Sequence, residues 1–413
     1  MMKMGTWYRW AGTLALAALA ACGGGGSGDS GSTGGGGGGT ATGSVGTLRL
    51  SLTDSPACGY DHAWVTVEKV RVHASGTAGD GDAGWHEVAL SPPLRVDLLT
   101  LTNGALVALG QTELPAGSYT QLRLVLAAND ALNPYVNAVT PSGGSLTPLT
   151  TPSAQQSGLK LNVQMTVPAG EVADFAIDFD ACKSFVKAGK SGKILLKPVL
   201  AVLPILSPAG QRIQGWLDPS LQAAGTTVSV QAAGEVVRAT PPLADGSGKF
   251  VLYPVPAGTY DLVVVAGGRT TAVVTGVPSK PASSTTVNSI AYPIDPPVSP
   301  RLAVGGQVTV GLSAVDTGGF VRALQTIGVG PTIEVTSDNA RADDGVYAML
   351  LPTGAPIVAP YVEGAVKLDF LPVPTSAGRY RLWASTTRSP QMMTADVVPG
   401  NDPVVQDFQF AAP

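Results

Sequence analysis

The sequence predicts an all-β protein of tandem β-sandwich domains, and two observations carry this prediction. Its 413 residues include 52 glycines and 33 prolines but only 13% charged residues, which favours many turns joining short strands. One turn pattern also occurs three times, at residues 114–119, 255–260 and 373–380, where a Pro and a Gly precede a Tyr that opens an apolar run. The three copies indicate three β units in series.

Residues 1–21 have the composition of an export signal, because Lys3 and Arg9 precede the apolar run at residues 11–21. The end of this run, Leu19-Ala20-Ala21-Cys22-Gly23, is similar to the lipobox of bacterial lipoproteins. The resemblance implies cleavage before Cys22 and anchoring to the membrane through lipid on that cysteine. It also implies outer-membrane sorting, since an Asp in place of Gly23 would favour retention in the inner membrane. The alternative is a plain secretory signal.

Residues 22–46 consist almost wholly of Gly, Ser, Thr and Ala, and they bury too little apolar surface to fold. We expect a flexible tether there. The net charge is −4, and it becomes −6 once Lys3 and Arg9 are removed with the signal. Because no basic patch remains, nucleic acid is excluded as a partner.

Two cysteines remain once Cys22 carries lipid. In an oxidising periplasm or at the cell surface, Cys58 and Cys182 are expected to form a disulfide. Two unpaired buried thiols are the alternative.

The first β unit is expected at residues 47–206. Apolar and polar residues alternate along residues 173–179, which predicts a strand with Phe175 and Ile177 on one face and Asp174 and Asp178 on the other. Asp180 is placed to cap a short helix at residues 181–188. The other expected strands are residues 47–53, 62–74, 85–88, 96–101, 105–109, 120–126, 159–167 and 194–206.

The ordered motifs of this unit resemble the bacterial lipoprotein family catalogued as domain of unknown function 4382. They lie at residues 52–56, 65–67, 70–73, 96–99, 114–119, 121–124, 178–180 and 196–199. The resemblance covers about residues 46–206. It implies a β-rich exported domain. The family has no agreed activity or catalytic residues that could be carried over to this sequence.

Two further sandwiches are expected after the first unit. The strands at residues 213–217, 227–230 and 255–265 resemble the transthyretin-like or carboxypeptidase-regulatory β-sandwich, over residues 211–293. The prolines of residues 293–300 predict an extended linker. A third sandwich is expected at residues 301–413, with strands at residues 307–310, 332–335, 366–370, 379–384 and 406–410.

Candidate catalytic residues are few, because a catalytic site needs convergent titratable groups. The three histidines, His62, His73 and His86, fall in one β-rich stretch, and a regular strand would not align them on one face. We therefore expect solvated or core histidines and no zinc site. The known sequence motifs of serine hydrolases, zinc proteases and P-loop proteins are absent.

The predicted disulfide suggests one metal candidate. It would bring the carboxylates of Asp54, Asp178 and Asp180 within about 10–15 Å of one another. Three carboxylates could bind a calcium ion. The alternative is structural: Asp54 serves its turn, Asp180 caps the helix, and Lys183 or Lys197 neutralises Asp178.

Three functions follow from these features. The sequence favours a non-catalytic lipoprotein of the cell envelope, used for binding, adhesion or envelope structure, with an unknown protein or glycan as partner. The second is a carbohydrate-binding lipoprotein, which needs exposed aromatic rings; Trp64, Trp85, Trp216 and Trp383 are few and lie in strand-like contexts, which favours core packing. The third is a hydrolase that uses the three carboxylates.

Overall fold

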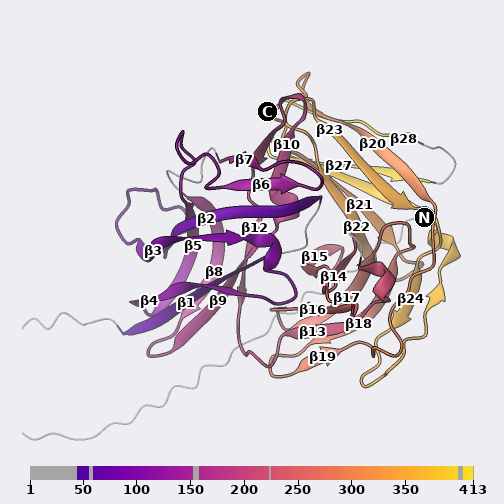
Figure 1. Ribbon diagram of the computed structural model, residues 1–413, viewed down its shortest axis with the longest axis horizontal. Helices are drawn as coiled ribbons and strands as arrows, with labels where there is room; N and C mark the ends of the chain where they lie inside the picture. Colours follow the sequence, from indigo (N-terminus) through magenta and orange to yellow (C-terminus); the bar gives the residue numbers. More distant parts are fainter. Residues whose placement is uncertain (1–43, 55–58, 152–157, 223–224, 399–402, 413) are drawn as a thin grey trace, which may run out of the picture. The chain divides into compact units, whose positions relative to one another are not determined.

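The regular secondary structure of the described residues is almost entirely β-strand, which confirms the predicted fold class (Figure 1). The computed structural model describes residues 44–54, 59–151, 158–222, 225–398 and 403–412. Residues Gly43–Pro413 form one compact unit. Among the described residues, no helix has the length and apolar character needed to cross a membrane.

The first sandwich packs a four-stranded sheet against an eight-stranded one. The smaller sheet has the order β12-β9-β1-β4 and contains β1 (Val45–Asp54), β4 (Val107–Pro115), β9 (Val172–Phe179) and β12 (Leu200–Pro204). The larger has the order β10-β11-β7-β6-β2-β5-β8, with β3 beside β2. Its strands are β2 (Tyr60–His73), β3 (His86–Asp97), β5 (Gly117–Leu126), β6 (Ala138–Pro141), β7 (Thr147–Thr150), β8 (Leu159–Val167), β10 (Phe185–Ala188) and β11 (Lys193–Leu196).

The core of this sandwich follows the alternation in the sequence. Leu48, Leu50 and Leu52 of β1 are fully buried, and Phe175 and Ile177 of β9 lie in the same apolar cluster. The helix expected over residues 181–188 is shorter: α1 (Ala181–Ser184) ends where β10 begins. Residues Phe185–Ala188 pair instead with β11, and this ladder supplies the backbone hydrogen bonds that a longer helix would have made.

The second sandwich contains a strand from a distant part of the chain. Its three-stranded sheet has the order β16-β13-β19, with β13 (Arg212–Trp216), β16 (Lys249–Leu252) and β19 (Ser284–Thr286). Its six-stranded sheet has the order β15-β14-β17-β18-β24-β25, with β14 (Thr227–Ala232), β15 (Glu235–Thr240), β17 (Gly258–Val265), β18 (Ala272–Ser279), β24 (Ile357–Pro360) and β25 (Leu371–Pro372). Strand β24 pairs with β18 in parallel, although the sequence placed its residues in the third unit.

The third sandwich consists of two four-stranded sheets. One has the order β23-β20-β28, with β29 also paired to β20, and the other has the order β22-β21-β26-β27. Their strands are β20 (Arg301–Val310), β21 (Gly319–Thr326), β22 (Thr332–Asn339), β23 (Val346–Pro352), β26 (Tyr380–Thr386), β27 (Ser389–Val397), β28 (Val404–Val405) and β29 (Phe408–Phe410). Short 3₁₀ turns complete the fold: η1 (Leu98–Thr100), η2 (Gly189–Ser191), η3 (Pro219–Leu221) and η4 (Pro374–Ser376).

The six-stranded sheet is covered on both faces. Leu262 and Val264 of β17 lie in the core of the second sandwich, while Val263 and Val265 pack in the core of the third. A strand buried on both faces needs an unbroken apolar run, which explains the sequence of β17. The second and third sandwiches therefore share this sheet as a common wall.

The recurrent Tyr of the Pro-Gly-Tyr pattern fixes the start of a strand. The Tyr119 hydroxyl donates to the Pro115 carbonyl, and the Tyr260 hydroxyl donates to the Pro256 carbonyl, each at 2.9 Å. In the third copy, the hydroxyl of Tyr380 donates to the carbonyl of Pro352 on β23. The first two turns thus use one local geometry, similar to the tyrosine corner of other β-sandwiches.

Candidate binding site at the junction of the three sandwiches

Asp54 ends β1 with a fully buried side chain. Its Oδ1 accepts a hydrogen bond of 3.0 Å from the backbone N–H of Ala181, the first residue of α1. Its Oδ2 has no hydrogen-bond partner among the residues that the structure describes. Burial raises the pKa of this carboxyl well above its usual range, and the nearby charges of Asp178 and Asp180 raise it further. Asp54 therefore joins β1 to α1.

Asp178 forms a buried ion pair with Arg238, which lies on β15 of the second sandwich. Both side chains are almost completely excluded from solvent. The same guanidinium donates to the Thr53 hydroxyl at 2.6 Å. The sequence suggested Lys183 or Lys197 as the neutralising group for Asp178; Lys183 instead pairs with Asp180 and Lys197 with Asp316.

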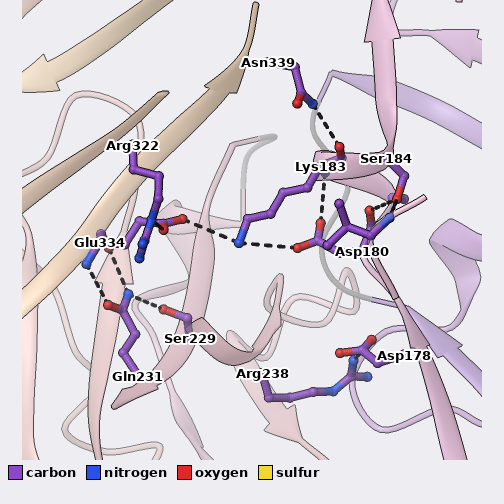
Figure 2. Close-up of polar contacts among 12 residues, drawn as sticks. Asp178, Asp180, Lys183, Ser184, Ser229, Gln231, Arg238, Arg322, Glu334 and Asn339 are labelled. Carbon is purple, nitrogen blue, oxygen red and sulfur yellow. Dashed lines mark hydrogen bonds and ion pairs between the residues drawn. The ribbon is translucent and has the colours of Figure 1, made fainter. Parts of the chain in front are cut away.

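Asp180 caps α1, as the sequence predicted, by accepting a hydrogen bond of 3.0 Å from the backbone N–H of Lys183. The Lys183 ammonium lies 3.6 Å from Asp180 Oδ2 and 3.7 Å from Oε1 of Glu334, a residue of β22 in the third sandwich (Figure 2). Burial raises the pKa of Asp180 although Lys183 opposes this shift. Lys183 thus connects the first sandwich with the third.

Glu334 extends the network into the second sandwich. Its other carboxylate oxygen pairs with Arg322 of β21, and Arg322 Nη1 lies 2.6 Å from Oε1 of Glu235 on β15. The Gln231 side chain donates to the Glu334 carbonyl at 2.8 Å and accepts from the Glu334 N–H at 2.7 Å (Figure 2). These contacts link all three sandwiches, and Gln231, Arg322 and Glu334 among them are buried.

A cavity of about 620 Å³ lies beside this network. Its lining comes from all three sandwiches and includes Tyr60, Asp180, Gln231 and Asp338. Burial raises the pKa of Tyr60 to about 12, with a smaller contribution from the charge of Asp338, so the phenol is a hydrogen-bond donor at neutral pH. The junction is therefore a candidate site for a small polar ligand.

The three carboxylates proposed for calcium lie close together, and each already has a partner. Asp54 accepts a hydrogen bond from the N–H of Ala181. Asp178 forms an ion pair with Arg238, and Asp180 forms one with Lys183. Within the described residues, no group of three or more His, Cys, Asp or Glu side chains is placed to hold a metal ion. Asp178 is thus paired with the Arg238 guanidinium of the second sandwich, Asp180 with Lys183 of the helix that it caps, and Asp54 with a backbone N–H.

The predicted cysteine roles depend on residues outside the described part of the chain. Cys22 and Cys58 both fall there, whereas Cys182 lies on α1. Lipid on Cys22 and a disulfide between Cys58 and Cys182 both stay predictions.

The three histidines lie in separate environments. His62 Nδ1 lies 2.6 Å from Asp97 Oδ2, and His73 Nε2 lies 2.9 Å from the Ala83 carbonyl oxygen. The His86 ring packs at 6.1 Å from the ring of Tyr119. Each of the three imidazole rings thus has a different partner.

The four tryptophans of the described residues are half-buried, and each has a cation over its ring. The distances from cation to ring centroid are 4.2 Å for Arg95 over Trp64, 4.6 and 4.7 Å for Arg71 and Arg123 over Trp85, 5.9 Å for Lys249 over Trp216 and 5.3 Å for Arg322 over Trp383. Sequence reasoning missed these contacts, because most of the cations lie on other strands than the ring they cover.

Residues 45–198 match the model of a family described as a domain of unknown function, DUF4382. The match supports the resemblance noted for about residues 46–206, and the resemblance of residues 211–293 to transthyretin-like sandwiches is not confirmed. No curated protein matches the chain.

The chain is similar to several solved structures, pilins among them. The TIE protein of Bacillus anthracis is 11% identical, with a TM-score of 0.14, and the match covers 89% of this chain and 51% of that one. A streptococcal ancillary pilin is 11% identical (TM-score 0.17, 88% and 99% covered), and BcpA, the major pilin subunit of Bacillus cereus, is 13% identical (TM-score 0.17, 89% and 100% covered). This chain spans about half of the TIE protein chain.

Proposed function

We propose that this protein is a lipid-anchored, non-catalytic binding or adhesion protein of the bacterial cell envelope. The strongest support is that the carboxylates at the junction form ion pairs with cations of the protein itself. Asp178, Asp180 and Glu334 each face a cation that belongs to the junction itself. A carboxylate that acts as an acid or base must instead reach the substrate and exchange a proton with it. The ion pairs favour a structural role for these groups.

The anchor that we propose is lipid on Cys22, with residues 22–46 as the tether. The lipobox-like end of the signal supports this assignment, and Gly23 supports sorting to the outer membrane. Such a tether would hold the sandwiches away from the bilayer and present them to a protein or glycan partner.

Metabolic labelling tests the anchor. Cells that express the full chain are fed an alkyne fatty acid, and the protein is isolated and coupled to a fluorophore. We expect the label on the wild type and on the control Ser27→Ala, and its loss in Cys22→Ala together with release from the membrane fraction. A Cys22→Ala protein that keeps both label and membrane association would refute the anchor.

A disulfide between Cys58 and Cys182 is also proposed. Its support is the hydrogen bond from the N–H of Ala181, the residue before Cys182, to Asp54, which lies four residues before Cys58 in the sequence. Non-reducing peptide mapping should find one cross-linked peptide that contains both cysteines. Two alkylated thiols after unfolding without reductant would disprove the bridge.

The alternative functions have direct tests. A glycan array in which Trp85→Ala abolishes a wild-type signal would favour a carbohydrate-binding lipoprotein. The cations that cover the tryptophan rings argue against open stacking platforms.

Hydrolysis of a glycoside that is lost in Asp178→Asn would favour a carboxylate-based hydrolase. Cross-linking of the lipidated protein in intact cells, followed by mass spectrometry, would identify the partner.

A further inference from the structure

A second cavity, of about 810 Å³, lies between the first and third sandwiches. Its walls come from the start of β8, from residues 196–199 and from the ends of β21, β22 and β26. Most of the lining is apolar, with side chains from Leu159, Val186, Leu196, Val199, Phe320 and Ala340. A cavity of this size, within the range of about 300–1,000 Å³ typical of ligand sites, could enclose much of a small apolar molecule.

The charged side chains in this lining have one sign. They are Lys160, Lys183 and Lys197, and no described Asp or Glu belongs to the lining. The chain as a whole is acidic, with a net charge of −4, so a purely cationic lining is a local feature. It favours an anion over a cation or a neutral ligand.

The three ammonium groups differ in how far they are neutralised. The ammonium group of Lys183 points toward Asp180 and Glu334 (Figure 2). Its methylene groups are therefore the part of this side chain that lines the cavity. Lys197 lies 2.7 Å from Asp316, but Arg388 also approaches this carboxylate, at 3.6 Å. Two cations therefore share one acid.

Lys160 carries the least compensated charge. It lies on β8 with an exposed side chain, and it forms no ion pair within the described part of the chain. Together with the excess charge around Asp316, it gives the rim of the apolar cavity a net positive charge.

We propose that this cavity binds an anionic amphiphile, a molecule with an apolar body and one carboxylate or phosphate head. The apolar walls would remove the body from water, and the ammonium groups of Lys160 and Lys197 would hold the head at the rim. This site is separate from the proposed anchor on Cys22, so the failure of one proposal leaves the other standing.

Calorimetry on residues 43–413 tests the site. These residues form the compact unit and lack the lipidated cysteine, so no detergent competes for the cavity. The probes are dodecanoate and dodecyl phosphate below their micelle concentrations, with dodecyltrimethylammonium as a control of equal chain length and opposite charge. We expect at least one anionic probe to bind and the cationic one not to bind.

Substitutions at Lys160 locate the head group. Lys160→Met should weaken binding about three- to tenfold, as expected for the loss of one charge-assisted contact, whereas Lys160→Arg should retain it. Lys193→Met, which changes an exposed lysine of β11 outside the lining, is the matched control and should bind as the wild type does. Urea midpoints within error of the wild type would show that the fold is unchanged.

A variant of the apolar wall tests the other half of the site. Val199 is 43% exposed, so Val199→Asp should be tolerated by the fold while it places a carboxylate against the ligand. We expect more than about tenfold weaker binding. Absence of heat with both anions, equal binding of the cationic probe, or wild-type affinity in both Lys160→Met and Val199→Asp would each overturn the proposal.

Discussion

Arg238 of the second sandwich and Asp178 of the first form an ion pair that is buried from solvent on both sides. The pair lies where β15 and β9 approach one another, and Arg238 also bonds the Thr53 hydroxyl of β1. Arg238 therefore connects the second sandwich to the small sheet of the first.

Removal of Arg238 should be strongly destabilising. Arg238→Met leaves Asp178 buried without a counter-charge, and such a loss costs about 3–5 kcal/mol of the free energy of unfolding. Urea denaturation followed by tryptophan fluorescence measures it. The matched control is Arg381→Met, whose pair with Asp396 is exposed to solvent, and its urea midpoint should stay close to that of the wild type.

The double variant Arg238→Met, Asp178→Leu tests whether the buried charge causes the loss. It removes both charges and should recover most of the stability. If the double variant is as unstable as Arg238→Met, packing of the long side chain is the main contribution.

Asp54 should make stability depend on pH. Because burial raises its pKa, the folded protein keeps a proton that the unfolded chain releases above its own pKa of about 3.9. The stability linked to this proton is fully present below about pH 4 and is lost as the pH rises through the raised pKa of the folded state. Asp54→Asn keeps an acceptor for the N–H of Ala181 and removes the charge.

We expect the urea midpoint of Asp54→Asn to exceed that of the wild type at pH 8, with the difference shrinking toward pH 4. Asp396→Asn, at an exposed position, controls for the loss of one carboxylate. A difference of equal size at both pH values would contradict the assignment.

The Tyr hydroxyls at the strand entries should have a measurable effect on stability. Tyr119→Phe and Tyr260→Phe each remove one hydrogen bond to a proline carbonyl and should cost about 1 kcal/mol in urea denaturation. Tyr135→Phe changes an exposed tyrosine and should have no effect. Equal stability of all three variants would show that the recurrent Tyr acts through its ring alone.

Calcium should not bind at Asp54, Asp178 and Asp180. Arg238 and Lys183 lie against two of these carboxylates, and a divalent ion would have to displace both cations. Calorimetry with about 1 mM calcium, in the range of weak extracellular sites, should give no binding heat. Binding that disappears in Asp178→Asn would instead establish the site.

Features that depend on the local alternation of apolar and polar residues can be predicted from the sequence. The buried faces of β1 and β9 follow from Leu48, Leu50, Leu52, Phe175 and Ile177, and the cap at Asp180 follows from its place before α1. These features depend on neighbours in the chain, so a single sequence contains the signal.

Partners that are distant in the sequence leave no comparable signal. Arg238 lies in the run Glu235-Val236-Val237-Arg238, where nothing marks it as the counter-ion of Asp178 in another sandwich. The four residues of β24 could extend any open sheet edge, and only packing decides that they pair with β18. The apolar run of β17 predicted a strand, while the burial of both its faces depends on the third sandwich.

The position of β1 determines how the fold responds to tension. The described chain enters its first sheet through this strand, which is bonded on one edge to β4 and on the other to β9. A pull on the residues before Val45, directed along the strand, would load both ladders at once, so that many hydrogen bonds share the force and none can open singly from an end. A protein held by its N-terminal segment would thus meet mechanical stress at a strand that is hydrogen-bonded along both of its edges.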